Sequence, residues 1–209
     1  MASRKRRQVE VDPRALVLAI PLAQGFADLG LVGYNQFANR FVGAQNKVSV
    51  LSPNDTALAV AAVTNMALAA ELFVKIFLYQ ATGAYATGHD LAELEDQLPI
   101  DCRALLERSF ERAMARKPNL LRLDLQLFEG EPPEPQTAAS INHVADAIKY
   151  SADLFVKLRY LHEDVRAGFA ASIDFQSIIF LVEALKASVA DYNGGNLTVK
   201  WRGAGDLGP

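Results

Sequence analysis

At 209 residues, with 51% apolar and 22% charged side chains, the chain has the composition of a globular protein, and its length suits one domain. The formal net charge of −3 gives no overall attraction to nucleic acid, and the single cysteine excludes an intrachain disulfide. A lone cysteine also fits a reducing compartment, so we expect a cytoplasmic protein.

The N-terminus combines a basic segment, residues 4–7, with an apolar run at 15–23, which is the order found in a signal peptide. Glu10 interrupts the charge pattern, and Pro21 breaks the apolar run. The run is also shorter than the roughly 18 apolar residues of a membrane helix. We therefore expect residues 1–14 to form a disordered basic tail, and we expect no membrane partner.

Two helices are predicted in the first part of the chain. Aromatic residues at helical spacing predict a helix over 26–42 with one face packed inward (Tyr34, Phe37 and Phe41). Ser52, Pro53 and Asp55 then form a start signal, an S-x-x-D box with proline at the first helical position. The helix that follows, 53–81, is long and has few charges, which predicts a central position in the fold.

Two shorter helices are expected next. A T-x-x-D box from Thr87 to Asp90 predicts a helix that closes at Pro99, and Asp101 is expected to cap the following helix. On that following helix three arginines, each four residues from the next, form a basic ridge (Arg108, Arg112 and Arg116). Neighbouring glutamates favour a solvated surface, and contact with RNA is the alternative.

One segment breaks the helical pattern. In 121–128 leucine alternates strictly with polar residues, which is the period of a strand. A second candidate strand lies at 196–201, so the two either pair with each other or meet another chain. We assign 118–136 to an insertion loop and 193–209 to a flexible C-terminal tail.

Helical periodicity returns over 138–163 and 175–192. The sequence therefore predicts an all-α fold, an up-and-down bundle of five or six helices within a single domain spanning 15–192. We expect 53–81 and 138–163 to lie antiparallel at its centre. The sequence contains no Gly-rich phosphate loop, no Cys/His metal spacing and no Ser-His-Asp arrangement, so we expect neither a cofactor nor a metal.

A polar cluster is predicted from two parts of the chain. Glu71 and Lys75 are four residues apart on one helix and suit an ion pair, while His89 and Asp90 open the next helix, where an acidic residue favours the positive helix end. The apolar stripe of 138–163 continues onto charged residues (Arg159 and Glu163, with His162 at its margin).

A core-facing arginine needs a partner, because burying an unpaired charge is very costly. Glu163 can pair with Arg159 within the helix, and Glu71 can do so across the bundle.

Glu71 with Lys75, then Gly83, then the His-Asp-Leu of 89–91 resemble the HEPN superfamily of prokaryotic helical domains. In that family an E-x-x-x-K-like helix is followed by a glycine loop and an H-D-L helix start. The resemblance covers about 55–192. It implies a four- or five-helix bundle that is commonly a homodimer and often acts in toxin–antitoxin or defence systems.

The stretch LRYLHE at 158–163 also resembles the late-helix arginine region of some HEPN-like proteins. Active members are metal-independent endoribonucleases in which four to six residues separate an arginine from a histidine. Here two residues separate Arg159 from His162. The pair still shares one helix face, where it can offer a base to the 2′-hydroxyl and a cation to the developing phosphorane charge.

Three functions are therefore open. The one we favour is a non-catalytic, dimeric HEPN-like module that binds a protein or RNA, with Arg159–Glu163 as a buried ion pair. The second is a ribonuclease toxin that uses Arg159 and His162. The third is a helical structural or regulatory protein. We expect the twofold interface of the homodimer to involve 138–163 or 175–192.

Overall fold

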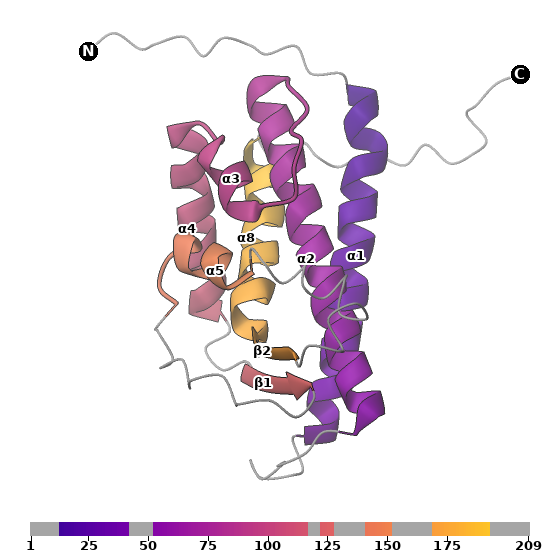
Figure 1. The fold of residues 1–209 in the computed structure, drawn as a ribbon. Helices are drawn as coiled ribbons and strands as arrows, with labels where there is room; N and C mark the ends of the chain where they lie inside the picture. Colours follow the sequence, from indigo (N-terminus) through magenta and orange to yellow (C-terminus); the bar gives the residue numbers. More distant parts are fainter. Residues whose placement is uncertain (1–12, 42–51, 117–121, 128–140, 152–168, 193–209) are drawn as a thin grey trace, which may run out of the picture.

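The protein is a bundle of helices with two short strands toward one end (Figure 1). The computed structural model describes residues 13–41, 52–116, 122–127, 141–151 and 169–192. In chain order the elements are α1 (Pro13–Phe41), α2 (Pro53–Thr82), α3 (Leu91–Asp96), α4 (Ile100–Arg116), β1 (Arg122–Leu127), α5 (Val144–Ser151), β2 (Phe169–Asp174) and α8 (Phe175–Tyr192). The six helices of this described part confirm the predicted all-α class.

α1 and α2 form a closely packed antiparallel pair. Arg40 near the end of α1 binds Asp55 in the first turn of α2, and the glycines of α1 meet α2 progressively further along its length. A Cβ atom at Gly30 would come within 2.5 Å of Met66 Cγ, and one at Gly33 within 3.1 Å of Ala62 Cβ. These two glycines therefore allow the helix backbones to approach each other closely.

α1 is longer than the sequence predicted. It begins at Pro13, ahead of the expected 26–42, and it includes Pro21. Pro21 is exposed, so the carbonyl that loses its helical hydrogen bond faces water, and the helix continues because its opposite side packs into the core through Ala23 and Ala27. The expectation that Pro21 interrupts the apolar segment is therefore wrong.

Two helices in the described residues are long and apolar enough to cross a membrane, judged by length and composition alone: Leu16–Arg40 and Asn54–Thr82. In the most apolar window of the first, 22% of the residues are buried in the bundle, against 56% in the second. The second has the burial of a core helix. The first, on α1, leaves apolar side chains at the surface.

α8 lies at the centre of the bundle, packed against α2, α4 and α5 (Figure 1). Phe175, at its start, stacks on Phe37 near the end of α1, and Tyr192, at its end, contacts Phe77 near the end of α2. α8 therefore runs parallel to α2 and antiparallel to α1. The prediction that 53–81 is a central helix is confirmed by the burial of α2.

The helix predicted over 138–163 begins later than expected, at Val144. The side chains of Asp146 and Glu107 explain this start. Asp146 Oδ2 accepts the backbone N–H groups of residues 142 and 143, each at 3.2 Å, and Glu107 Oε2 accepts that of Val144 at 3.2 Å. Residues 152–168 lie outside the described part, so the expected antiparallel arrangement of 138–163 and 53–81 stays a prediction; among the described elements it is α8 that packs along α2 at the centre.

The alternating segment 121–128 forms strand β1, as predicted. Its partner is β2, in antiparallel register, with Arg122 opposite Asp174 and Leu127 opposite Phe169. The other predicted strand, 196–201, lies outside the described residues. β2 was not predicted, since Phe169–Asp174 has no clear alternation, and it leads directly into α8.

The helix starts follow local chemistry, with two corrections. Ser52 caps α2 by accepting the backbone N–H of Asp55 at 3.1 Å, as predicted. Hydrogen bonding from Ser52, with the neighbouring Arg40, lowers the pKa of Asp55 below its usual value. At α3 the cap is Asp90 itself, so the predicted box from Thr87 is wrong. α4 begins at Ile100, so Asp101 lies in its first turn and not at the cap.

Candidate functional site

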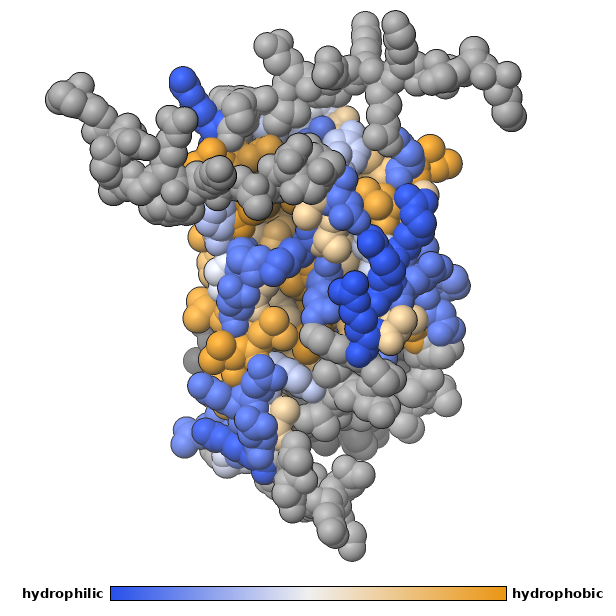
Figure 2. Space-filling model, turned by 180° about the vertical axis from the view of Figure 1, so that it is seen from behind, coloured by the Kyte–Doolittle hydropathy of each residue, from blue (hydrophilic) through white to orange (hydrophobic). Residues whose placement is uncertain are grey.

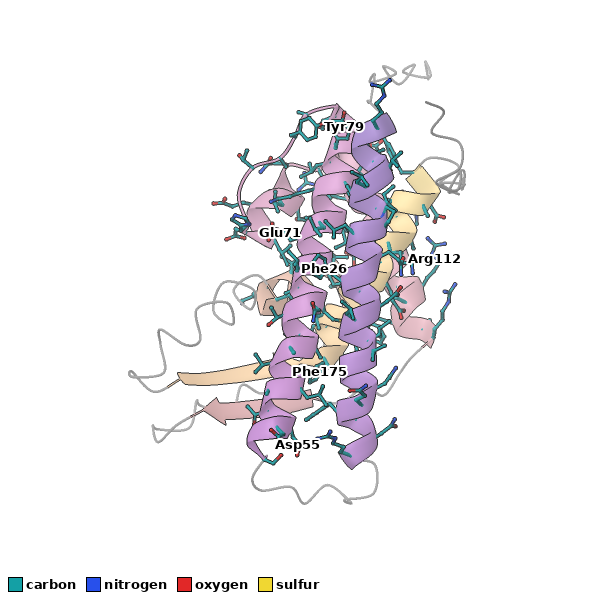
Figure 3. The ribbon with its side chains drawn as sticks, turned by 90° about the vertical axis from the view of Figure 1, so that its right-hand side faces the viewer. Phe26, Asp55, Glu71, Tyr79, Arg112 and Phe175 are labelled. Atoms are coloured by element: carbon teal, nitrogen blue, oxygen red, sulfur yellow. The ribbon has the colours of Figure 1, made fainter. Side chains whose placement is uncertain are left out.

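The candidate site lies where α2 meets the start of α3. Glu71, in the middle of α2, is only 4% exposed. Figure 3 labels Glu71 on α2. Its Oε1 atom accepts a hydrogen bond from Lys75 Nζ at 2.7 Å and lies 2.9 Å from His89 Nδ1. The structure therefore brings together three of the predicted polar residues around one buried oxygen.

Each side chain of this cluster is placed by a local feature. Lys75 is one helical turn after Glu71, so the pair needs only the geometry of α2. His89 directly precedes Asp90, whose Oδ1 accepts the backbone N–H groups of Ala92 at 2.7 Å and Glu93 at 3.3 Å. The cap fixes the start of α3, and the contact between His89 and Glu71 ties that start to α2.

The cluster is chemically an anchored carboxylate. An ionised carboxylate only accepts hydrogen bonds, so the contact at 2.9 Å requires that His89 Nδ1 carries a proton. The His89 side chain is 58% exposed and that of Lys75 is 23% exposed, against 5% for Glu71. The Lys75 ammonium and the His89 N–H therefore reach the buried carboxylate from the surface side, and the contact of His89 joins the start of α3 to α2.

The second carboxylate oxygen of Glu71 is buried as well. Among the residues that the structure describes, Oε2 has no hydrogen-bond partner. A buried carboxylate oxygen without a partner is costly, so a donor for Oε2 is expected. Arg159, predicted to reach Glu71, lies outside the described residues together with His162 and Glu163, and this pairing stays a prediction.

A second histidine–carboxylate pair joins α4 to the start of α5. His143 Nδ1 is 2.8 Å from Glu107 Oε1 on α4, and Glu107 also accepts the backbone N–H of Val144. Hydrogen bonding to Glu107, followed by its charge, raises the pKa of His143 above the usual value. The sequence analysis missed this pair, because 36 residues separate its members and no spacing signals it.

The basic ridge of α4 is exposed, as the solvated interpretation predicts. Its middle member, Arg112, is engaged: it donates to Asp191 of α8 at 2.8 Å and to Ser109 Oγ at 2.9 Å (Figure 3). This contact divides the ridge into Arg108 and Arg116, which flank an ion pair. The ridge therefore has less uncompensated positive charge than the sequence indicated.

The described part of the chain contains no group of three or more His, Cys, Asp or Glu side chains that could hold a metal ion. Comparisons with family models, with curated proteins and with solved structures return no match to this chain. The resemblance to HEPN domains therefore rests on the residues themselves.

Proposed function

We propose that this chain is a HEPN-like helical binding module, homodimeric and non-catalytic, that acts on a protein or RNA partner in a prokaryotic toxin–antitoxin or defence system. The observation that carries the proposal is the contact of Glu71 with Lys75 and His89, because the same three residues carry the resemblance. Glu71, Lys75 and His89 join α2 to the start of α3. This structural role accounts for their spacing in the sequence without any catalytic role.

A structural role fits the burial of the cluster. A general base has to reach the proton that it removes, and a carboxylate that is 4% exposed, with one oxygen held by Lys75 and His89, cannot reach a hydroxyl of a bound polymer. The described histidines are each bonded to a carboxylate, Glu71 for His89 and Glu107 for His143. Both pairs act between elements of the bundle.

The alternative is a metal-independent endoribonuclease that uses Arg159 and His162. Their spacing of three residues places them on one helix face if the segment is helical, and a dimer would bring two such pairs together. An unrelated structural or regulatory helical protein is the third hypothesis.

Incubation of the purified protein with structured RNA and a chelator tests the proposal, with the His162→Ala variant in parallel. We expect no cleavage by either protein. Cleavage by the wild type that is lost in His162→Ala would contradict the non-catalytic proposal and establish the ribonuclease.

Electrophoretic mobility shifts of the RNA in the same samples, at two salt concentrations, show whether the partner is RNA. RNA binding that weakens with salt, and that weakens further when Arg108 and Arg116 are replaced by glutamate, would assign the module to RNA. If the wild type binds no RNA, the proposal is restricted to a protein partner. Copurification of a partner encoded by a neighbouring gene then tests it.

A further inference from the structure

α1 has two apolar faces, and the bundle covers only one of them. The inner face packs on α2 and α8 through side chains that are almost fully buried (Ala23, Ala27, Tyr34 and Phe37). The outer face carries four large apolar side chains that are exposed: Leu18 at 78%, Leu22 at 52%, Leu29 at 60% and Val32 at 53%. In Figure 2, orange surface is visible along the side of the molecule where α1 runs.

The exposed residues have the spacing of a coiled-coil seam. With Gly25, they follow one another at intervals of four, three, four and three residues, which is the alternation of a heptad repeat. At about 100° per residue they lie within a narrow stripe, turned well away from the inner face. Isolated exposed leucines are ordinary, but a stripe at heptad spacing over four turns has the form of a helix-pairing surface.

The order of residues in the stripe is nearly the same when read in either direction. If a second α1 lies antiparallel across the first with a twofold axis at Gly25, Leu18 faces Val32 of the other copy and Leu22 faces Leu29. Gly25 then occupies the crossing point. A Cβ atom built there meets nothing within 4 Å in this chain, so a neighbouring backbone can approach closely at this position.

The charge pattern of α1 favours a second α1 helix over a lipid surface as the partner of this stripe. Helices that lie on membranes carry lysine and arginine along the polar face. Here α1 has basic residues only toward its ends, Arg14 and Arg40, and the charged residue beside the stripe is Asp28. Gln24 donates to Asp28 at 2.7 Å, so the flank of the stripe is a polar edge of the kind that borders a protein interface.

From this arrangement we infer that the outer face of α1 is the twofold interface of a homodimer, with two α1 helices crossing antiparallel at Gly25. The inference rests on the homodimer of the proposed function and relocates its interface, since α8 is buried along most of its length and has little surface left for a partner. The stripe from Leu18 to Val32 is about 21 Å long. A specific interface buries at least about 1,000 Å² of surface in total, and complexes near this lower limit are weak. Because the stripe is short, we expect a dimer with a dissociation constant in the micromolar range.

Light scattering on the full chain at about 100 μM tests the interface. We expect a dimer for the wild type and at least tenfold weaker association for Leu22→Glu and for Leu29→Glu, with the helical circular dichroism unchanged, because both side chains are exposed. Ala104→Glu, at an exposed position of α4, adds the same charge elsewhere and should stay dimeric.

A dimer that survives both glutamate variants would overturn the α1 interface and leave the proposed homodimer intact. A wild type that is monomeric at this concentration would overturn both. Flotation with neutral phosphatidylcholine vesicles, if lost in Leu22→Glu, would assign the face to a lipid bilayer and overturn the inference.

Cysteine cross-linking tests the direction of the helices. Gly25→Cys should form an intermolecular disulfide under mild oxidation, whereas wild type, whose only cysteine is the buried Cys102, should not. Leu18→Cys and Val32→Cys should cross-link when they are mixed and not when each is alone, because like positions lie about 21 Å apart in the antiparallel pair. Cross-linking of Val32→Cys alone would indicate a parallel pair and overturn the register.

Discussion

Two histidine–glutamate pairs in this molecule have the same geometry and different surroundings. His89 lies 2.9 Å from Glu71, and His143 lies 2.8 Å from Glu107, each through Nδ1 and Oε1. The Glu71 side chain is 5% exposed and the Glu107 side chain is 33% exposed. Because the two contact distances are nearly equal, we expect the burial of the carboxylate to decide the effect of breaking each pair.

The largest effect is expected from Arg159→Ala. If Arg159 is the donor for Glu71 Oε2, its removal leaves a buried carboxylate oxygen unpaired, and we expect the free energy of unfolding to fall by about 3–5 kcal/mol. Urea denaturation measures this change. In a Glu71→Met background the same substitution should cost much less, since the carboxylate is gone.

Equal losses in the two backgrounds would show that Arg159 has another partner, with Glu163 as the first to examine. His162→Ala is the matched control on the same segment, and its effect should be milder.

A smaller effect is expected from Lys75→Met, about 2 kcal/mol, the size of one hydrogen bond to a charged group, because His89 still partners Glu71 and the Lys75 side chain is partly exposed. Replacing both residues, Glu71→Met with Lys75→Met, should recover part of this loss, because no buried charge is then left unpaired. Thermal and urea denaturation of the single and double variants measure the coupling. A double variant less stable than the sum of the single changes would contradict this account of the cluster.

The smallest change in the free energy of unfolding is expected from breaking the more exposed pair, His143 with Glu107, and this change depends on pH. The pKa of His143 is raised in the folded state by Glu107, so the folded protein binds this proton more tightly than the unfolded chain does. The resulting stability is fully present below the unfolded pKa, about 6.5, and is lost as the pH rises through the raised folded value.

Melting temperatures of wild type and His143→Gln across this pH window measure the loss, and the two should converge at high pH. NMR titration should show the His143 pKa falling toward its usual value in Glu107→Gln. An unchanged pKa in that variant would mean that Glu107 is not its cause.

Features set by neighbouring residues were predictable. The cap at Ser52, the end of α2 at Gly83 and the pair of Glu71 with Lys75 all depend on residues within four positions of each other. The alternation that predicted β1 is equally local. Such features follow from helix and strand geometry, and they need no knowledge of what packs against them.

Features that join distant segments were missed or misplaced. The length of α1 through Pro21, the pairing of β1 with β2, the central place of α8 and the contact of His143 with Glu107 each depend on another part of the chain. Pro21 is tolerated because packing on α2 holds the helix around it, which periodicity within one segment does not reveal.

By itself, the amino-acid sequence determined the helical class, the long apolar α2 and the residues from which the Glu71 cluster is built. Only the tertiary structure decided that Glu71 is buried, that His89 meets it from 18 positions away, and that one apolar face of α1 is covered while the other is exposed. The physical reason is that propensity and periodicity act within a few residues of chain, whereas burial depends on which surfaces the whole fold brings together.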